Sequence, residues 1–291
     1  MTKVREETRG MSAIKSEFDE ICRWIKELGL LSQYIRLTET AKCLASLSKQ
    51  NEQQGGIQPS QLDLLALSFS GDLEIIYRAF KNRSDEIFTR KLDFALCGPL
   101  RTEEESLESD SNSGRNYLFE LLTAALFEVS GFKTRFDDLA DVSFAYLGQD
   151  YYVSCKRPWA KESANGIMKK ALKDIKKNLK ENPEGRWIMA FDVNRLLAPH
   201  DYTIDVTSYE DANKKIDLIH RQCLPLFRES LSKSRSDKIL ALLLSARFLG
   251  KEFIINRFTR INIPTLQPLI PANNPYFMAL EQIANELRTF N

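Results

Sequence analysis

The sequence predicts an α/β fold that is preceded by a helical region. Apolar residues recur at helical spacing between residues 13 and 98. From residue 115 onward, helical stretches alternate with short apolar stretches of strand length. Helices interleaved with buried strands indicate a sheet that is covered by helices on both faces. The longest apolar run, residues 239–244, is far below the ~18 residues that a membrane-spanning helix needs.

The first hundred residues are predicted to be helical. Two apolar stripes at helical spacing occupy residues 18–47, with a stop at Gly29. Residues 49–60 contain a Gly-Gly pair among polar residues, which predicts a linker. Shorter helices are predicted over residues 62–69 and 73–80, where Ser-Gly-Asp separates them. This region, residues 1–100, is a candidate surface for self-association or for a protein partner.

An acidic linker is predicted over residues 101–114, because residues 103–110 carry five acids and no base. A solvated loop is the simpler interpretation, and a segment that competes for a basic groove is the alternative. An α/β domain is expected over residues 115–291. Its elements are predicted as a helix over 115–129, strands over 132–147 (interrupted near Asp137-Asp138) and 150–156, a helix over 163–180, a strand over 186–193, a helix over 208–232, strands over 238–248 and 252–263, and a helix over 275–289.

Composition excludes several classes of protein. A net charge of +1 means that attraction to nucleic acid has to come from a local patch. Five scattered cysteines without a CxxC pair argue against a zinc site or a disulfide framework, and favour the cytoplasm. Two histidines exclude a multi-histidine metal site, and no phosphate-binding glycine motif occurs. The charged N-terminus, MTKVREETRG, predicts no secretory signal.

Two predicted neighbouring strands carry polar residues that should meet at one end. Asp141 begins the first strand and Lys156 ends the second. Since side chains alternate along a strand, Ser154 and Lys156 share one face and Cys155 takes the other. One end of a hairpin would then present Asp141, Ser154 and Lys156 together, a combination suited to metal-assisted phosphodiester cleavage.

The run GRNYLFEL…GF…ADVSF…YYVSCKRP resembles the PD-(D/E)XK nuclease superfamily, which includes archaeal Holliday-junction resolvases and many restriction endonucleases. It is most similar to a bacterial subgroup whose motif strand ends in CKR. The resemblance covers residues 113–197. It implies a restriction-endonuclease-like mixed sheet flanked by helices, and Mg²⁺ or Mn²⁺ as the cofactor.

The resemblance also implies roles for individual residues. Asp141 would hold the metal with help from Glu120, and the backbone carbonyl of Cys155 would be a further ligand. Lys156 would position the attacking water and the scissile phosphate. Ser154 stands where the family has a second acid, so one full negative charge is missing from the expected catalytic set.

Other acids are candidates for the missing charge, and each site residue also has a simpler interpretation. Glu120, Asp138 and Asp150 are the candidate replacements. Asp141 would otherwise only begin a strand, and Lys156 would be a solvated edge residue. Glu120 would pair with Arg115 or Lys133, and Ser154 has no nearby histidine that would activate it as a nucleophile.

The predicted helix that follows is strongly basic. Between residues 156 and 180 there are nine bases and two acids, a local charge of +7. A solvated face is the simpler interpretation, but the scarcity of acids favours salt-sensitive, sequence-independent contact with phosphates. The predicted nucleic-acid contacts are Arg157, Lys161, Lys169, Lys173, Lys176 and Lys180.

These observations favour a metal-dependent DNA endonuclease. The resemblance places it in bacterial defence, mobile-element or repair biology. The alternative is a nuclease fold that has lost its chemistry and acts as a nucleic-acid or protein-interaction module. A structural oligomerisation protein is a third interpretation, which leaves the basic helix unexplained.

Overall fold

A computed structural model describes residues 10–30, 34–54, 57–101, 104, 111–197, 203–205, 207–233, 237–252 and 257–289. The N-terminal helices are α1 (Met11–Glu27), α2 (Ile35–Gln54), α3 (Gln61–Phe80) and α4 (Glu86–Leu96). The later helices are α5 (Ser111–Val129), α6 (Lys161–Glu181), α7 (Asn194–Leu197), α8 (Tyr209–Lys233) and α9 (Phe277–Thr289). The strands are β1 (Thr134–Arg135), β2 (Val142–Tyr146), β3 (Gln149–Lys156), β4 (Arg186–Asp192), β5 (Thr203–Asp205), β6 (Ile239–Glu252) and β7 (Arg257–Pro268).

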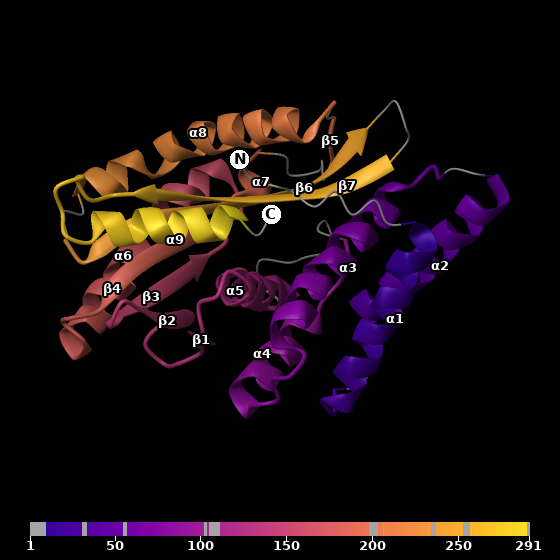
Figure 1. The fold of residues 1–291 in the computed structure, drawn as a ribbon, viewed down its shortest axis with the longest axis horizontal. Helices are drawn as coiled ribbons and strands as arrows, with labels where there is room; N and C mark the ends of the chain where they lie inside the picture. Colours follow the sequence, from indigo (N-terminus) through magenta and orange to yellow (C-terminus); the bar gives the residue numbers. More distant parts are fainter. Residues whose placement is uncertain are drawn as a thin grey trace.

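Local sequence signals explain where the N-terminal helices begin. Ser60 and Asp63 form a capping box at the start of α3, in which the Ser60 backbone N–H donates to Asp63 Oδ2 over 2.9 Å. Asp85 caps α4 by accepting a 3.0 Å hydrogen bond from the Phe88 N–H. In Figure 1, α1 to α4 gather at one end of the molecule, and α5 lies between them and β1 to β3.

Within the described residues the strands form one seven-stranded mixed sheet in the order β1-β2-β3-β4-β6-β5, with β7 also paired to β6. Strands β3, β4 and β6 run parallel, and β2 and β7 are antiparallel to their neighbours β3 and β6. The predicted α/β class with a mixed sheet is therefore confirmed.

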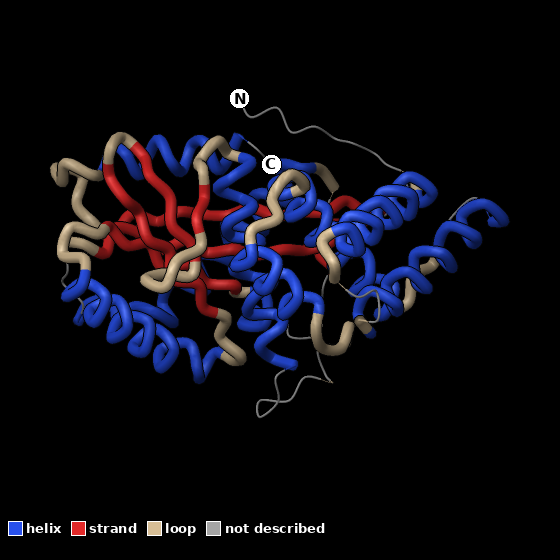
Figure 2. Tube along the Cα trace, turned by 90° about the horizontal axis from the view of Figure 1, so that it is seen from below, coloured by secondary structure: helices blue, strands red, loops and turns tan. Residues whose placement is uncertain are grey.

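The two faces of the sheet pack against different helices. On one face, Tyr152, Trp187 and Met189 pack with residues of α6 and α8. On the other face, Val153 and Ile188 join a core that contains residues from α1 to α5 and α9. Helices therefore lie on both sides of the strands, as Figure 2 shows from below. The core that contains residues from α1 to α5 therefore continues across the boundary near residue 100 that was predicted between the helical region and the α/β domain.

Several predicted boundaries move in the structure. Helix α3 is continuous through residues 70–72, because Ser70 and Asp72 are buried at 5% and 6% exposure rather than facing solvent as a break. Helix α2 extends to Gln54, into the predicted linker, and α5 begins at Ser111, so that the acidic linker ends earlier than predicted. Residues 102–103 and 105–110 of that linker lie outside the described residues.

A tight turn sets the register of the β2–β3 hairpin. Tyr146 pairs with Gln149, and the two residues between them, Leu147 and Gly148, have φ angles of 50° and 74°. Positive φ at both central residues is typical of the hairpin turn that matches strand twist. The resulting register pairs Val142 with Val153, which leaves the residue before β2 beside the last residues of β3.

Candidate functional site

The hairpin brings Asp141 to the end of β3. Asp141 Oδ2 accepts a 2.6 Å hydrogen bond from the backbone N–H of Cys155. This bond to the edge of β3 fixes the orientation of the carboxylate, because a charge-assisted bond to a backbone N–H is short and directional.

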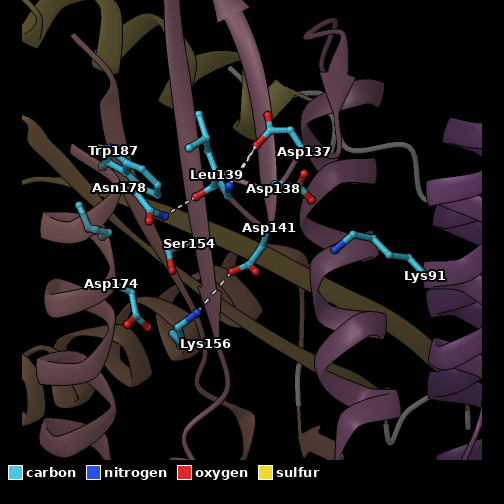
Figure 3. Close-up of a pocket in the computed structure, with 12 residues that line it drawn as sticks. Lys91, Asp137, Asp138, Leu139, Asp141, Ser154, Lys156, Asp174, Asn178 and Trp187 are labelled. Atoms are coloured by element: carbon cyan, nitrogen blue, oxygen red, sulfur yellow. Dashed lines mark hydrogen bonds and ion pairs between the residues drawn. The ribbon is translucent and has the colours of Figure 1, made fainter. Parts of the chain in front are cut away.

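The ammonium of Lys156 lies beside the same carboxylate, as Figure 3 shows. Lys156 Nζ is 3.4 Å from Asp141 Oδ2 and donates over 3.0 Å to the carbonyl oxygen of Cys155. The side chains of Lys156 and Asp141 are 25% and 27% exposed. The predicted pair is therefore formed, and it is open to solvent.

A cavity of about 340 Å³ contains this pair. It lies between the 137–141 segment, the end of β3, helix α6 and helix α4 (Figure 3). Its lining is mainly polar and consists of Lys91, Asp137, Asp138, Leu139, Ala140, Asp141, Ser154, Lys156, Asp174, Ile175, Asn178 and Trp187.

Glu120 of α5 belongs to the same electrostatic centre. Its carboxylate pairs with Lys91 of α4, and both side chains are largely buried, at 13% and 15% exposure. Burial, followed by repulsion from the Asp141 carboxylate, raises the pKa of Glu120 to about 7. Arg115, one of the partners considered from the sequence, donates instead to the carbonyl oxygen of Leu100.

Lys91 is a site residue that sequence reasoning missed. It comes from the N-terminal helical region, 29 positions before its partner Glu120. The close approach of α4 and α5 brings it there: a Cβ at Gly114 would lie 2.4 Å from the carbonyl oxygen of Cys97. No local sequence pattern around Lys91 indicates this contact. Gly114, which permits the close approach of α5, is recognisable in the sequence only as a residue of low helix propensity.

Ser154 and Cys155 take opposite faces, as the strand alternation predicts. Ser154 lines the cavity with a residue exposure of 5%. Cys155 packs in the core on the α5 face, where burial raises the pKa of its thiol well above the usual value. The thiol is therefore protonated and inert, and Cys155 contacts the site residues through its backbone N–H and carbonyl.

The other candidate acids, Asp138 and Asp150, and the neighbouring Asp137 lie in different places. Asp137 accepts hydrogen bonds from the N–H groups of Leu139 and Ala140, both over 3.0 Å, so its role is to hold the loop before Asp141. Asp138 lines the cavity. Asp150 lies at the far end of β3, where it forms a 2.7 Å ion pair with Arg135.

Arg157 does not lie on the surface that the nucleic-acid prediction requires. Its side chain is 7% exposed, and its Nε is 3.7 Å from Asp192 Oδ2. Asp192 also accepts from Arg247 Nη2 over 2.6 Å, and Arg247 Nη1 donates over 2.8 Å to Asp72 of α3. A buried arginine that is engaged in this way is not available to bind phosphate.

The α6 lysines divide into two groups. Lys169 lies 3.8 Å from Glu229 of α8, so it borders that helix. Lys173, Lys176 and Lys180 are exposed, and Lys161 is exposed at the first residue of α6. The same helix lines the cavity through Asp174, Ile175 and Asn178, whereas its lysines are not among the lining residues of the cavity.

Histidine chemistry does not reach the cavity within the described residues. His220 of α8 is buried, and its Nδ1 lies 2.7 Å from Thr265 Oγ1. Burial lowers the pKa of His220 to about 4, so the ring is neutral at physiological pH. His200 lies outside the described residues.

The described residues contain no group of three or more His, Cys, Asp or Glu side chains that is arranged to hold a metal ion. None of their helices combines the length and the apolar character of a membrane span.

Comparisons with protein-family models, with curated proteins and with solved structures found no match. The fold and the site define the class of protein. It is an α/β protein with a mixed sheet and an open, charged cavity where β2 begins and β3 ends.

Proposed function

We propose that this chain is a metal-dependent endonuclease that hydrolyses DNA phosphodiester bonds at the Asp141–Lys156 site. One observation carries the proposal: a carboxylate and an ammonium lie 3.4 Å apart at one end of a hairpin, inside an open cavity. A carboxylate beside a lysine is the pairing that the resemblance to PD-(D/E)XK nucleases implies.

The chemistry of the surrounding donors suits Mg²⁺ or Mn²⁺. The carboxylates of Asp141 and Glu120 and the carbonyl of Cys155 are all hard oxygen donors, which these ions prefer. Burial first, and repulsion from the Asp141 carboxylate second, raise the pKa of Glu120, and a cation beside both acids would relieve the repulsion. When bound, such an ion supplies Lewis-acid polarisation of the phosphate and lowers the pKa of coordinated water.

The protein side chains supply orientation and charge. The Cys155 N–H holds Asp141 in place. The Lys156 ammonium binds a non-bridging phosphate oxygen and stabilises the negative charge that develops during hydrolysis. Exposed lysines on α6, which borders the cavity, hold the DNA backbone without reading its sequence.

Binding without cleavage is the second candidate function, and specific observations favour it. Ser154 provides no carboxylate where the family has one. Both acids proposed as metal ligands already have an internal cation, since Lys156 lies beside Asp141 and Lys91 beside Glu120. A site that is neutralised in this way would bind phosphates through its lysines and leave them uncut.

Plasmid and single-stranded DNA, incubated with Mg²⁺, Mn²⁺ or EDTA, separate the two functions. We expect cleavage that requires the metal and is lost in Asp141→Ala and Lys156→Ala. Asp150→Ala, an acid at the other end of the same strand, is the matched control and should cleave normally. Salt-sensitive DNA binding without cleavage under any of these conditions would instead establish the binding module.

A further inference from the structure

The N-terminal helices contribute a charged group to the site through Lys91. Its ammonium pairs with Glu120 of α5, and Lys91 also lines the cavity that holds Asp141 and Lys156. Figure 3 shows the Lys91 side chain extending toward Asp141 from the side of the cavity opposite α6. Two carboxylate–ammonium pairs therefore meet here. The Asp141–Lys156 pair lines the cavity, and the Lys91–Glu120 pair reaches it through Lys91.

The two pairs are electrostatically linked. Glu120 is affected by the charges of Asp141 and Lys156 as well as by that of Lys91. Since charges that are partly shielded from water interact strongly, a cation bound by the two acids would weaken their attraction to both lysines. Lys91 is thus an internal counter-ion at the place where the divalent ion is expected.

Aromatic rings give the Lys91 ammonium a second stabilising environment. Its Nζ lies 5.4 Å from the ring centroid of Tyr117 and 5.5 Å from that of Phe136. Both distances are within the range of cation–π attraction, which persists when the carboxylate partner is taken by another cation. Lys91 is therefore able to release Glu120 without losing all of its favourable contacts.

From these contacts we infer that Lys91 is a positioning residue that competes with the divalent metal ion for Glu120. In the free protein it neutralises Glu120 and keeps the acid pair stable. A metal ion held by Asp141 and Glu120 would take the place of the Lys91 ammonium at Glu120, and the ammonium would keep its contacts with the Tyr117 and Phe136 rings. This inference rests on the proposed function, because it concerns the same metal.

Lys91→Met tests the competition, because methionine keeps the apolar stem against the rings and removes the charge. Isothermal titration with MnCl₂ on the full chain should show roughly tenfold tighter binding than in the wild type, the effect of deleting one competing, partly buried ion pair. Arg90→Ala, the exposed neighbour on α4, should leave Mn²⁺ affinity unchanged. A merely structural role for Lys91 would not raise metal affinity.

The outcomes separate this inference from the function on which it rests. Mn²⁺ binding that is lost in Asp141→Ala but equal or weaker in Lys91→Met overturns the inference and leaves the nuclease proposal standing. Absence of Mn²⁺ binding in the wild type and in Lys91→Met overturns both. Melting curves report whether each variant is folded, and Lys91→Gln repeats the test if the methionine variant does not fold.

Discussion

Two charge centres lie close together in this molecule and differ in exposure. The Asp141–Lys156 pair is about one quarter exposed and borders a cavity. The Asp72–Arg247–Asp192 network is sealed, with side chains between 4% and 12% exposed. The open pair leaves its charges available to a ligand, whereas the sealed network connects α3 to the end of β4 and to the interior of β6.

The two centres are joined through adjacent residues of the chain. Lys156 belongs to the open pair, and Arg157, the next residue, lies against Asp192 of the sealed network. Strand alternation sends the two side chains to opposite faces of the sheet. A basic residue beside the site lysine thus serves the stability of the fold, and its sequence position alone does not reveal this.

Arg247→Met, which disrupts the sealed network, should lower the free energy of unfolding more than any other substitution considered. It leaves the buried carboxylates of Asp72 and Asp192 without their shared cation, and we expect a loss of about 3–5 kcal/mol in the free energy of unfolding. Urea denaturation measures this loss. Lys156→Met, which removes a cation from the open pair, should change stability by no more than about 1 kcal/mol. Equal losses in the two variants would show that the centres do not differ.

Acid pH tests another buried group, His220 of α8, which lies outside both charge centres. The pKa of His220 is lowered by burial to about 4, below its unfolded value of about 6.5. Stability from this group is therefore fully present above pH 6.5 and is lost as the pH falls toward 4, by about 3 kcal/mol. His220→Asn, which can still hydrogen-bond Thr265, should flatten the stability–pH curve in this range. Parallel curves for the two proteins would contradict the assignment.

Ser154→Glu should have the smallest of these effects, and it changes the metal affinity of the Asp141–Lys156 site. It restores an acid on the face of β3 that carries Lys156, within the cavity. We expect Mn²⁺ affinity to rise roughly tenfold, which corresponds to about 1.4 kcal/mol. Calorimetry with Ser154→Ala as the control measures the gain. An affinity equal to that of the control would mean that Ser154 does not occupy a metal-binding position.

Periodicity in the sequence was sufficient for the element types and for the faces of β3. The predicted helix over 163–180 and strand over 186–193 appear as α6 and β4. Ser154 and Cys155 lie on opposite faces as expected, because the pleat of a strand follows from local backbone geometry. The meeting of Asp141 and Lys156 also follows locally, since a two-residue turn sets the register between them.

Contacts between distant segments were beyond reach from the sequence. Ser-Gly-Asp at residues 70–72 resembles a helix break, but Asp72 remains in α3 because Arg247, 175 positions away, pairs with it. From the sequence alone, Arg157 is a candidate for phosphate contact, but in the folded protein its side chain is buried against Asp192. Lys91 joins the site only when α4 packs on α5. Local patterns reflect the backbone geometry of neighbouring residues, whereas the partner of a buried charge depends on how the whole chain folds.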